Sequence, residues 1–81
     1  MLEADRLRLT DMAQRIDLIG SWVDGLDESA FMADLRTRDA VALNIQLIGE
    51  TARRLNEDVK AKAPEIPWPA IVALRNRIAH G

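Results

Sequence analysis

The chain has 81 residues, of which 11 are Lys or Arg, 13 are Asp or Glu and 48% are hydrophobic, so its net charge is −2. This balance excludes an intrinsically disordered chain, and the length excludes two full domains, so we expect a single domain over residues 1–81. The absence of cysteine excludes disulfides, thiolate zinc sites and a cysteine nucleophile.

No apolar run approaches the roughly 18 residues that a membrane helix needs. The N-terminal segment Met1–Asp5 is acidic and lacks the apolar stretch of a signal peptide. We therefore expect a cytoplasmic protein with no membrane partner.

Helical periodicity begins near the N-terminus. An apolar stripe spaced by three and four residues predicts a first helix over about residues 2–23, and it consists of Leu9, Met12, Ile16, Ile19 and Val23. Gly25 interrupts this pattern. Asp27 is then a suitable N-cap for a short helix that continues through Leu35.

The longest apolar stripe follows and predicts a helix over about residues 38–62, capped by Thr37 and ended by Pro64. The stripe consists of Val41, Ile45, Ile48, Ala52, Leu55 and Val59. Gly49 inside this helix indicates either the close approach of another helix or simple tolerance of a residue that costs about 1 kcal/mol relative to alanine.

A last helix is predicted from about Trp68 to the C-terminus, with Pro67 or Pro69 in its first turn. No segment has the pattern of a strand, so the predicted fold is all-α: a small up-and-down bundle of three main helices plus one short helix. Because the last pattern continues to Gly81, we expect the natural chain to continue into a further helix. In so small a core we expect Trp22 and Trp68 to be packing residues.

Charge is distributed unevenly along the chain. Residues 1–52 carry five arginines against ten acidic residues, a net of −5, whereas residues 53–81 carry six basic residues against three acidic ones, a net of +3. A basic C-terminal third either attracts an anionic substrate or is an ordinary solvated face.

The basic segment ends in the only histidine of the chain. At about 100° per residue, Arg75, Asn76 and His80 share an arc of about 140° on the last helix. An imidazole can move the proton of a ribose 2′-hydroxyl, an arginine can hold the phosphate and an asparagine can orient either group, so the set suits metal-free RNA cleavage. One histidine gives one acid–base group per chain, and two chains across a two-fold axis would supply two. Alternatively, these are surface residues and His80 only offsets the helix dipole.

Short segments along the whole chain resemble a known family in their order and spacing. They are Asp5–Leu7, Asp39–Val41, Asn44, Ile48–Ala52, Pro64–Trp68 and Arg75–His80. Together they resemble the HEPN superfamily, and more narrowly the HepT-like toxins that are paired with minimal nucleotidyltransferase (MNT) antitoxins.

The resemblance implies a helical bundle that dimerises with its motifs facing a shared cleft. It implies a metal-independent endoribonuclease that needs no cofactor, with Arg75 and His80 as the catalytic pair and Asn76 in support. It also implies neutralisation by a nucleotidyltransferase, in some members through AMP transfer to a tyrosine two residues after the histidine. That position would be residue 82, and this chain contains no tyrosine.

Other functions remain open at this point. The domain is alternatively a catalytically inactive module that binds RNA or a nucleotide, or a purely structural dimerisation bundle. Glu50, beside the long apolar stripe, either orients Arg75 or tunes His80, or it forms an ordinary ion pair between helices.

Overall fold

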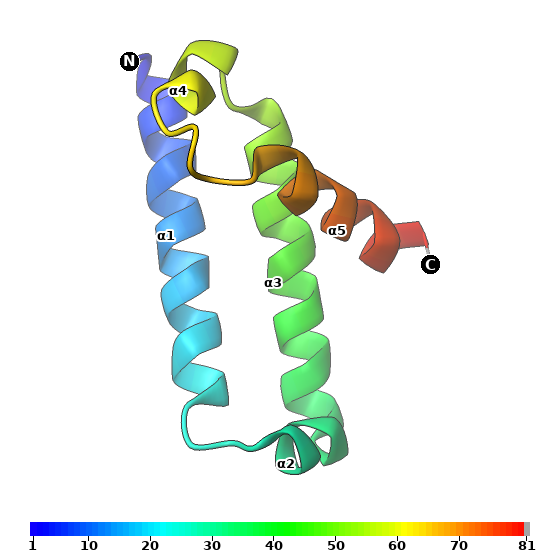
Figure 1. Cartoon of the computed structure of the whole chain (residues 1–81). Coiled ribbons are helices and arrows are strands. Elements are labelled where there is room, and N and C mark those ends of the chain that lie inside the picture. The colour runs from blue at the N-terminus through cyan, green and yellow to red at the C-terminus, as the bar shows by residue number, and fades with distance from the viewer. Residues whose placement is uncertain (81) are drawn as a thin grey trace.

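The computed structural model describes residues 1–80, which form five helices and no strand. The three long helices are α1 (Glu3–Val23), α3 (Leu35–Arg54) and α5 (Trp68–His80), and the two short ones are α2 (Glu28–Ala33) and α4 (Glu57–Ala61). Figure 1 shows α1 and α3 side by side in antiparallel directions, with α5 crossing α3 on the side away from the length of α1. The predicted all-α bundle is confirmed, with two short helices instead of one. Gly81, which the prediction included in the last helix, lies outside the described residues.

The first helix has nearly its predicted bounds. It ends where Gly25 adopts a φ of +78°, a left-handed conformation that favours glycine. Met12 is buried in the core, and Leu9 and Ile19 pack against that core. The prediction was wrong for Ile16, which is 56% exposed, because α1 packs mainly against one neighbour, α3, and the strip that this contact covers is narrow.

The turn between α2 and α3 differs from the prediction. Asp27 caps α2 as expected, since its Oδ1 accepts a hydrogen bond from the Ala30 amide at 2.7 Å. The short helix ends at Ala33, however, and Asp34 caps α3 by accepting from the Thr37 amide at 3.1 Å. Thr37 is therefore not the cap, because a carboxylate three residues earlier satisfies its amide and the helix starts at Leu35.

The predicted long helix over 38–62 is interrupted. The helix α3 ends at Arg54, Leu55 is extended with a ψ of 142°, and Asn56 caps α4 by accepting from the Asp58 amide. The apolar stripe hid the break because Leu55 is buried and Val59 is half-buried on either side of it. Pro64 consequently follows α4 and does not end the long helix.

The core lies where α1, α3 and the first turns of α5 meet. Its buried side chains are Met12, Ile48, Ala52 and Leu55, and Trp68, Ile71 and Val72 pack against them. The indole Nε1 of Trp68 donates to the carbonyl oxygens of Lys60 and Ala63 at 3.2 and 3.1 Å. The packing role predicted for Trp68 is confirmed. Trp22 is instead 37% exposed near the end of α1.

A buried polar contact joins α1 to α3. Asn44 is 7% exposed, its Oδ1 accepts from Arg15 Nη1 at 2.9 Å, and its Nδ2 donates to the Ala40 carbonyl at 2.8 Å. Arg15 also donates to Asp11 at 3.0 Å. Asn44 is therefore satisfied within the fold and joins the two long helices.

Among residues 1–80, no helix combines the length and the apolar character that crossing a membrane requires.

Candidate active site on the last helix

The last helix crosses α3 at a glycine. A Cβ atom on Gly49 would collide with the Arg75 Cβ, and it would lie 2.9 Å from the Arg75 Cγ and 3.1 Å from the Ile71 carbonyl oxygen. Any larger residue at position 49 would push α5 away from α3. Of the two interpretations of Gly49, close helix approach is confirmed, and the glycine lets the first side-chain carbons of Arg75 and the backbone of Ile71 lie directly against α3.

Arg75 reaches the next residue of α3. Its Nη2 lies 3.2 Å from Glu50 Oε2, and both side chains are about one-fifth exposed, at 23% and 22%. Glu50 Oε2 and Arg75 Nε are buried and form no hydrogen bond, so the contact is an ion pair held by charge. Charge holds the arginine near α3 without fixing its orientation as two hydrogen bonds would.

Two further arginines contact the same carboxylate. Glu50 Oε1 lies 2.7 Å from Arg53 Nη2 and 3.3 Å from Arg54 Nε. The hydrogen bond from Arg53 is the main cause that lowers the pKa of Glu50, with smaller attractions from Arg53, Arg75 and Arg54. Three cations around one anion leave a net charge of +2 at this end of α3. The sequence analysis did not place Arg53 and Arg54 at the candidate site. Their i,i+3 and i,i+4 spacing from Glu50 is nevertheless a signal for such ion pairs.

Asn76 is exposed and lies next to the arginine. Its Oδ1 accepts a hydrogen bond from Arg75 Nη1 at 3.0 Å, so the guanidinium lies between the amide and Glu50. This contact occupies the carbonyl side of Asn76 and leaves Nδ2 as a donor. Arg75 and Asn76 are thus in direct contact.

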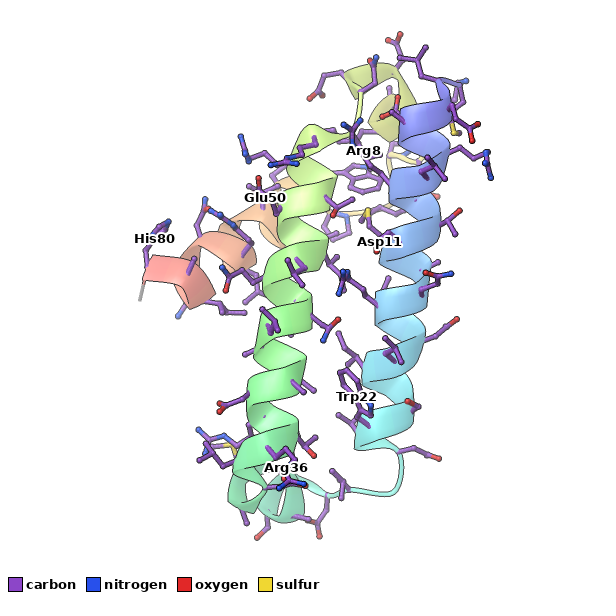
Figure 2. The ribbon with its side chains drawn as sticks, turned by 180° about the vertical axis from the view of Figure 1, so that it is seen from behind. Arg8, Asp11, Trp22, Arg36, Glu50 and His80 are labelled. Carbon is purple, nitrogen blue, oxygen red and sulfur yellow. The ribbon has the colours of Figure 1, made fainter. Side chains whose placement is uncertain are left out.

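His80 is exposed in the last turn of α5, one turn beyond Asn76. Figure 2 shows His80 at the outer end of α5, apart from Glu50 at the crossing. The ion pairs of Glu50 are with arginines, so its contacts do not support the tuning of His80. They fit both the orientation of Arg75 and an ordinary ion pair between α3 and α5. The helix brings all three predicted residues to one strip of α5, in which Arg75 is half-buried against α3 and Asn76 and His80 are exposed.

Within residues 1–80, no three histidine, aspartate or glutamate side chains gather in an arrangement that could hold a metal ion. The chemical groups available on the strip are a guanidinium, an amide and an imidazole. They can bind a phosphate and move a proton.

The fold and the strip together define a small all-α domain that carries an arginine–asparagine–histidine motif on its last helix. The HepT-like family, described as "Ribonuclease HepT-like", matches residues 12–81, and the chain belongs to this family.

Two curated relatives resemble the chain over most of its length. "Probable ribonuclease HepT" of Thermococcus cleftensis is 32% identical over 72 residues, which are 89% of this chain and 66% of that protein. "Putative RNase MJ1380" of Methanocaldococcus jannaschii is 31% identical over 72 residues, again 89% of this chain and 66% of that protein. The chain therefore spans slightly less than two thirds of these relatives. No solved structure matches the chain.

Proposed function

We propose that the protein is a metal-independent endoribonuclease that cleaves RNA in the cytoplasm, in a cleft shared by two copies of the chain. The observation that carries the proposal is the strip on α5, where Arg75 contacts Asn76 and His80 follows one turn later. Membership of a ribonuclease family and the relatives' names support the same chemistry.

The strip suggests a division of roles. Arg75 binds the scissile phosphate and offsets the charge that develops on it. The imidazole of His80 accepts the proton of the ribose 2′-hydroxyl as its oxygen attacks phosphorus, or it gives a proton to the departing 5′-oxygen. The bond that forms is 2′-oxygen to phosphorus, and the bond that breaks is phosphorus to 5′-oxygen. Asn76 and Glu50 position Arg75 from its two sides.

A second copy of the chain completes the chemistry. Each chain holds one histidine, and this reaction uses one group to accept a proton and another to donate one. Two motifs facing each other across a two-fold axis provide both groups. The exposure of His80 is consistent with a residue that faces a shared cleft.

Cleavage of single-stranded RNA in excess EDTA tests the proposal, with the protein purified as its gene encodes it. The wild type is expected to cleave, and His80→Ala is expected to lose at least about a hundredfold of the rate. Arg36→Ala is the control, because Arg36 is exposed at the opposite end of α3. This variant is expected to retain full activity. Cleavage that persists in His80→Ala would overturn the catalytic assignment. RNA binding without cleavage by the wild type would favour the alternative, an inactive binding module.

A partner also belongs to the proposal. The resemblance to HepT-like toxins favours neutralisation by a cognate minimal nucleotidyltransferase antitoxin. Co-expression with a nucleotidyltransferase encoded beside this gene is expected to yield a complex with reduced RNA cleavage. Undiminished cleavage by a purified complex would contradict the antitoxin role.

A further inference from the structure

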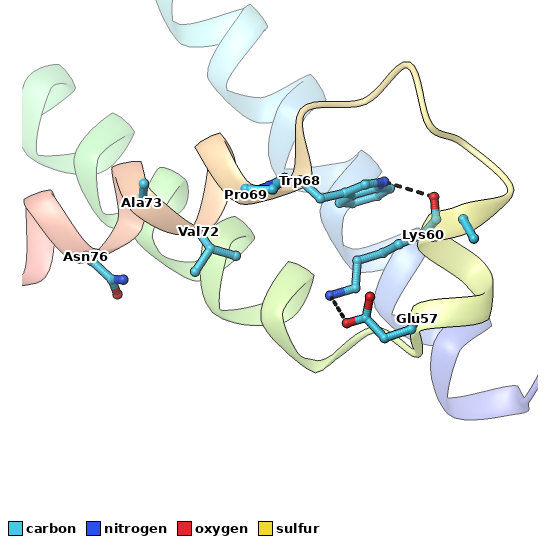
Figure 3. Close-up of a pocket in the computed structure, with 8 residues that line it drawn as sticks. Glu57, Lys60, Trp68, Pro69, Val72, Ala73 and Asn76 are labelled. Carbon is cyan, nitrogen blue, oxygen red and sulfur yellow. Dashed lines mark hydrogen bonds and ion pairs between the residues drawn. The ribbon is translucent and has the colours of Figure 1, made fainter.

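A groove of about 620 Å³ separates α4 from α5. On the α5 side it is lined by Pro69, Val72, Ala73 and Asn76, as Figure 3 shows. Trp68 bounds it at the start of α5, and its ring is fixed by the two hydrogen bonds from Nε1. The groove therefore has a preformed wall and begins beside the core.

The groove ends at the candidate active site. Pro69, Asn76 and His80 fall within an arc of about 40° around α5, so they lie on one face of the helix. Asn76 lines the groove and also accepts the hydrogen bond from Arg75. His80 follows about 6 Å further along the helix axis. A ligand in the groove thus reaches Asn76 of the motif, with Arg75 as the preceding residue and His80 one turn further along the same helix.

The lining of the groove has two kinds of surface. Its middle is apolar, formed by Pro69, Val72 and Ala73. Its ends are polar, with the Asn76 amide at one end and the Lys60–Glu57 pair, 3.1 Å apart, at the other. A nucleobase presents an apolar face and a polar edge, so it matches both kinds of surface.

The two ends of the groove differ in charge, which favours one orientation of a bound RNA strand. Lys60 is neutralised by Glu57, whereas Asn76 at the other end accepts a hydrogen bond from Arg75, whose counter-charge Glu50 is shared with Arg53 and Arg54. An RNA strand is therefore attracted by its phosphate to Arg75, and its base faces the apolar middle of the groove. A duplex hides its base faces by stacking, so the groove suits an unpaired strand.

We propose that the groove between α4 and α5 is a base-binding subsite for single-stranded RNA, which holds the unpaired base next to the scissile phosphate. The proposal rests on the ribonuclease function above and names the form of RNA that the site takes. It assigns Val72, Ala73 and Trp68 to substrate binding in addition to the motif residues.

Filling the groove tests the proposal. Ala73→Trp places a large side chain in the groove from an exposed helix position. Ala70→Trp is the matched control, because Ala70 is exposed on the same helix and does not line the groove. With a uridine-rich single-stranded oligonucleotide, Ala73→Trp is expected to lower kcat/KM about tenfold, mainly through KM. Ala70→Trp is expected to remain within about twofold of the wild type. Circular dichroism and urea unfolding check that both variants fold.

The outcomes separate this subsite from the ribonuclease function. Equal kcat/KM in the two variants overturns the subsite while the ribonuclease function stands. If the wild type does not cleave RNA, the ribonuclease function fails and the subsite is judged by anisotropy with the same labelled oligonucleotide. Weaker binding by Ala73→Trp alone supports the subsite, and equal binding or no binding overturns it.

Tryptophan fluorescence gives an independent readout. In a Trp22→Phe background, Trp68 is the single indole, and it borders the groove. Saturation with the unlabelled oligonucleotide is expected to change its emission if a base stacks in the groove. Unchanged emission at saturation would overturn the proposal.

Discussion

Two adjacent residues of α3 determine how α5 presents its motif. Gly49 lets the backbone of α5 approach, and Glu50 holds the guanidinium of Arg75 by charge. The missing side chain of Gly49 and the carboxylate of Glu50 therefore act together on the position of Arg75. The position of Arg75 therefore depends on α3 as much as on its own helix.

A pair of glycine substitutions tests the close approach. Gly49→Ala is expected to destabilise the fold by about 1–3 kcal/mol, because the new Cβ collides with the Arg75 side chain. Gly20→Ala is expected to stabilise it by about 0.5–1 kcal/mol, because nothing lies within 4 Å of the added Cβ and alanine favours the helix. Urea unfolding midpoints measure both changes. A neutral or stabilising Gly49→Ala would contradict the packing at this crossing.

The Glu50 carboxylate predicts a pH dependence of stability. Its pKa is lowered in the folded protein from the ordinary value of 4.5, mainly by the hydrogen bond from Arg53. A lowered folded-state pKa means that the unfolded chain binds the proton more readily. The stabilisation is therefore full above about pH 4.5 and is lost as the pH falls through the folded-state value.

The matched variant Glu50→Gln isolates that contribution. The wild type is expected to lose more stability than Glu50→Gln between pH 5 and pH 3, since other acidic groups such as Asp34 titrate in both proteins. Urea unfolding at several pH values measures the difference. Parallel stability curves would show that the arginine cluster does not stabilise the charged form.

At the scale of the elements, a buried carboxylate fixes the junction of α3 and α4. Asp5 is only 2% exposed, and its Oδ1 accepts from the Asn56 backbone amide at 3.2 Å. It also pairs with Arg8 at 3.4 Å. The contact joins the start of α1 to the break between α3 and α4, 51 residues later in the sequence.

Removal of this carboxylate is expected to loosen the junction. Asp5→Ala should cost about 1–3 kcal/mol, because the Asn56 amide loses its partner and Arg8 loses its counter-charge. Glu3→Ala is the control, since its exposed pair with Arg6 is worth less than about 1 kcal/mol. Thermal unfolding of the two variants provides the comparison. An equally small effect in both would exclude a special role for Asp5.

At the scale of the whole molecule, the core is small. Among residues 1–80 the buried apolar side chains are Met12, Val41, Ile48, Ala52 and Leu55. Several large apolar side chains remain exposed, including Ile16, Leu18, Leu43 and Leu74. A domain of this size gains stability when it covers such surface with a partner.

The shared-cleft mechanism predicts a dimer. Sedimentation equilibrium of the wild type is expected to give about twice the mass of one chain. His80→Ala is expected to dimerise as the wild type does, because His80 is exposed and contributes little packing. Variant and wild type should have similar unfolding midpoints. A monomer at high concentration would contradict the shared cleft and remove the second acid–base group from the proposed mechanism.

The sequence by itself determined the helical class, the bounds of α1, the start of α5 and the strip of Arg75, Asn76 and His80. These features depend on local periodicity, capping residues and helical geometry, which nearby residues decide. The apolar stripe also identified the buried face of α3 correctly, since Val41, Ile48 and Ala52 are buried.

Tertiary structure alone decided the rest. The hydrogen bond from the Asn56 amide at the break to the distant Asp5 could not be read from the sequence, and the exposure of Ile16 depends on how few helices contact α1. The choice between close approach and tolerance at Gly49, and the contact of Glu50 with Arg75, likewise required the crossing of α5 over α3. Periodicity describes one helix at a time, whereas these features arise between segments that are far apart in the chain.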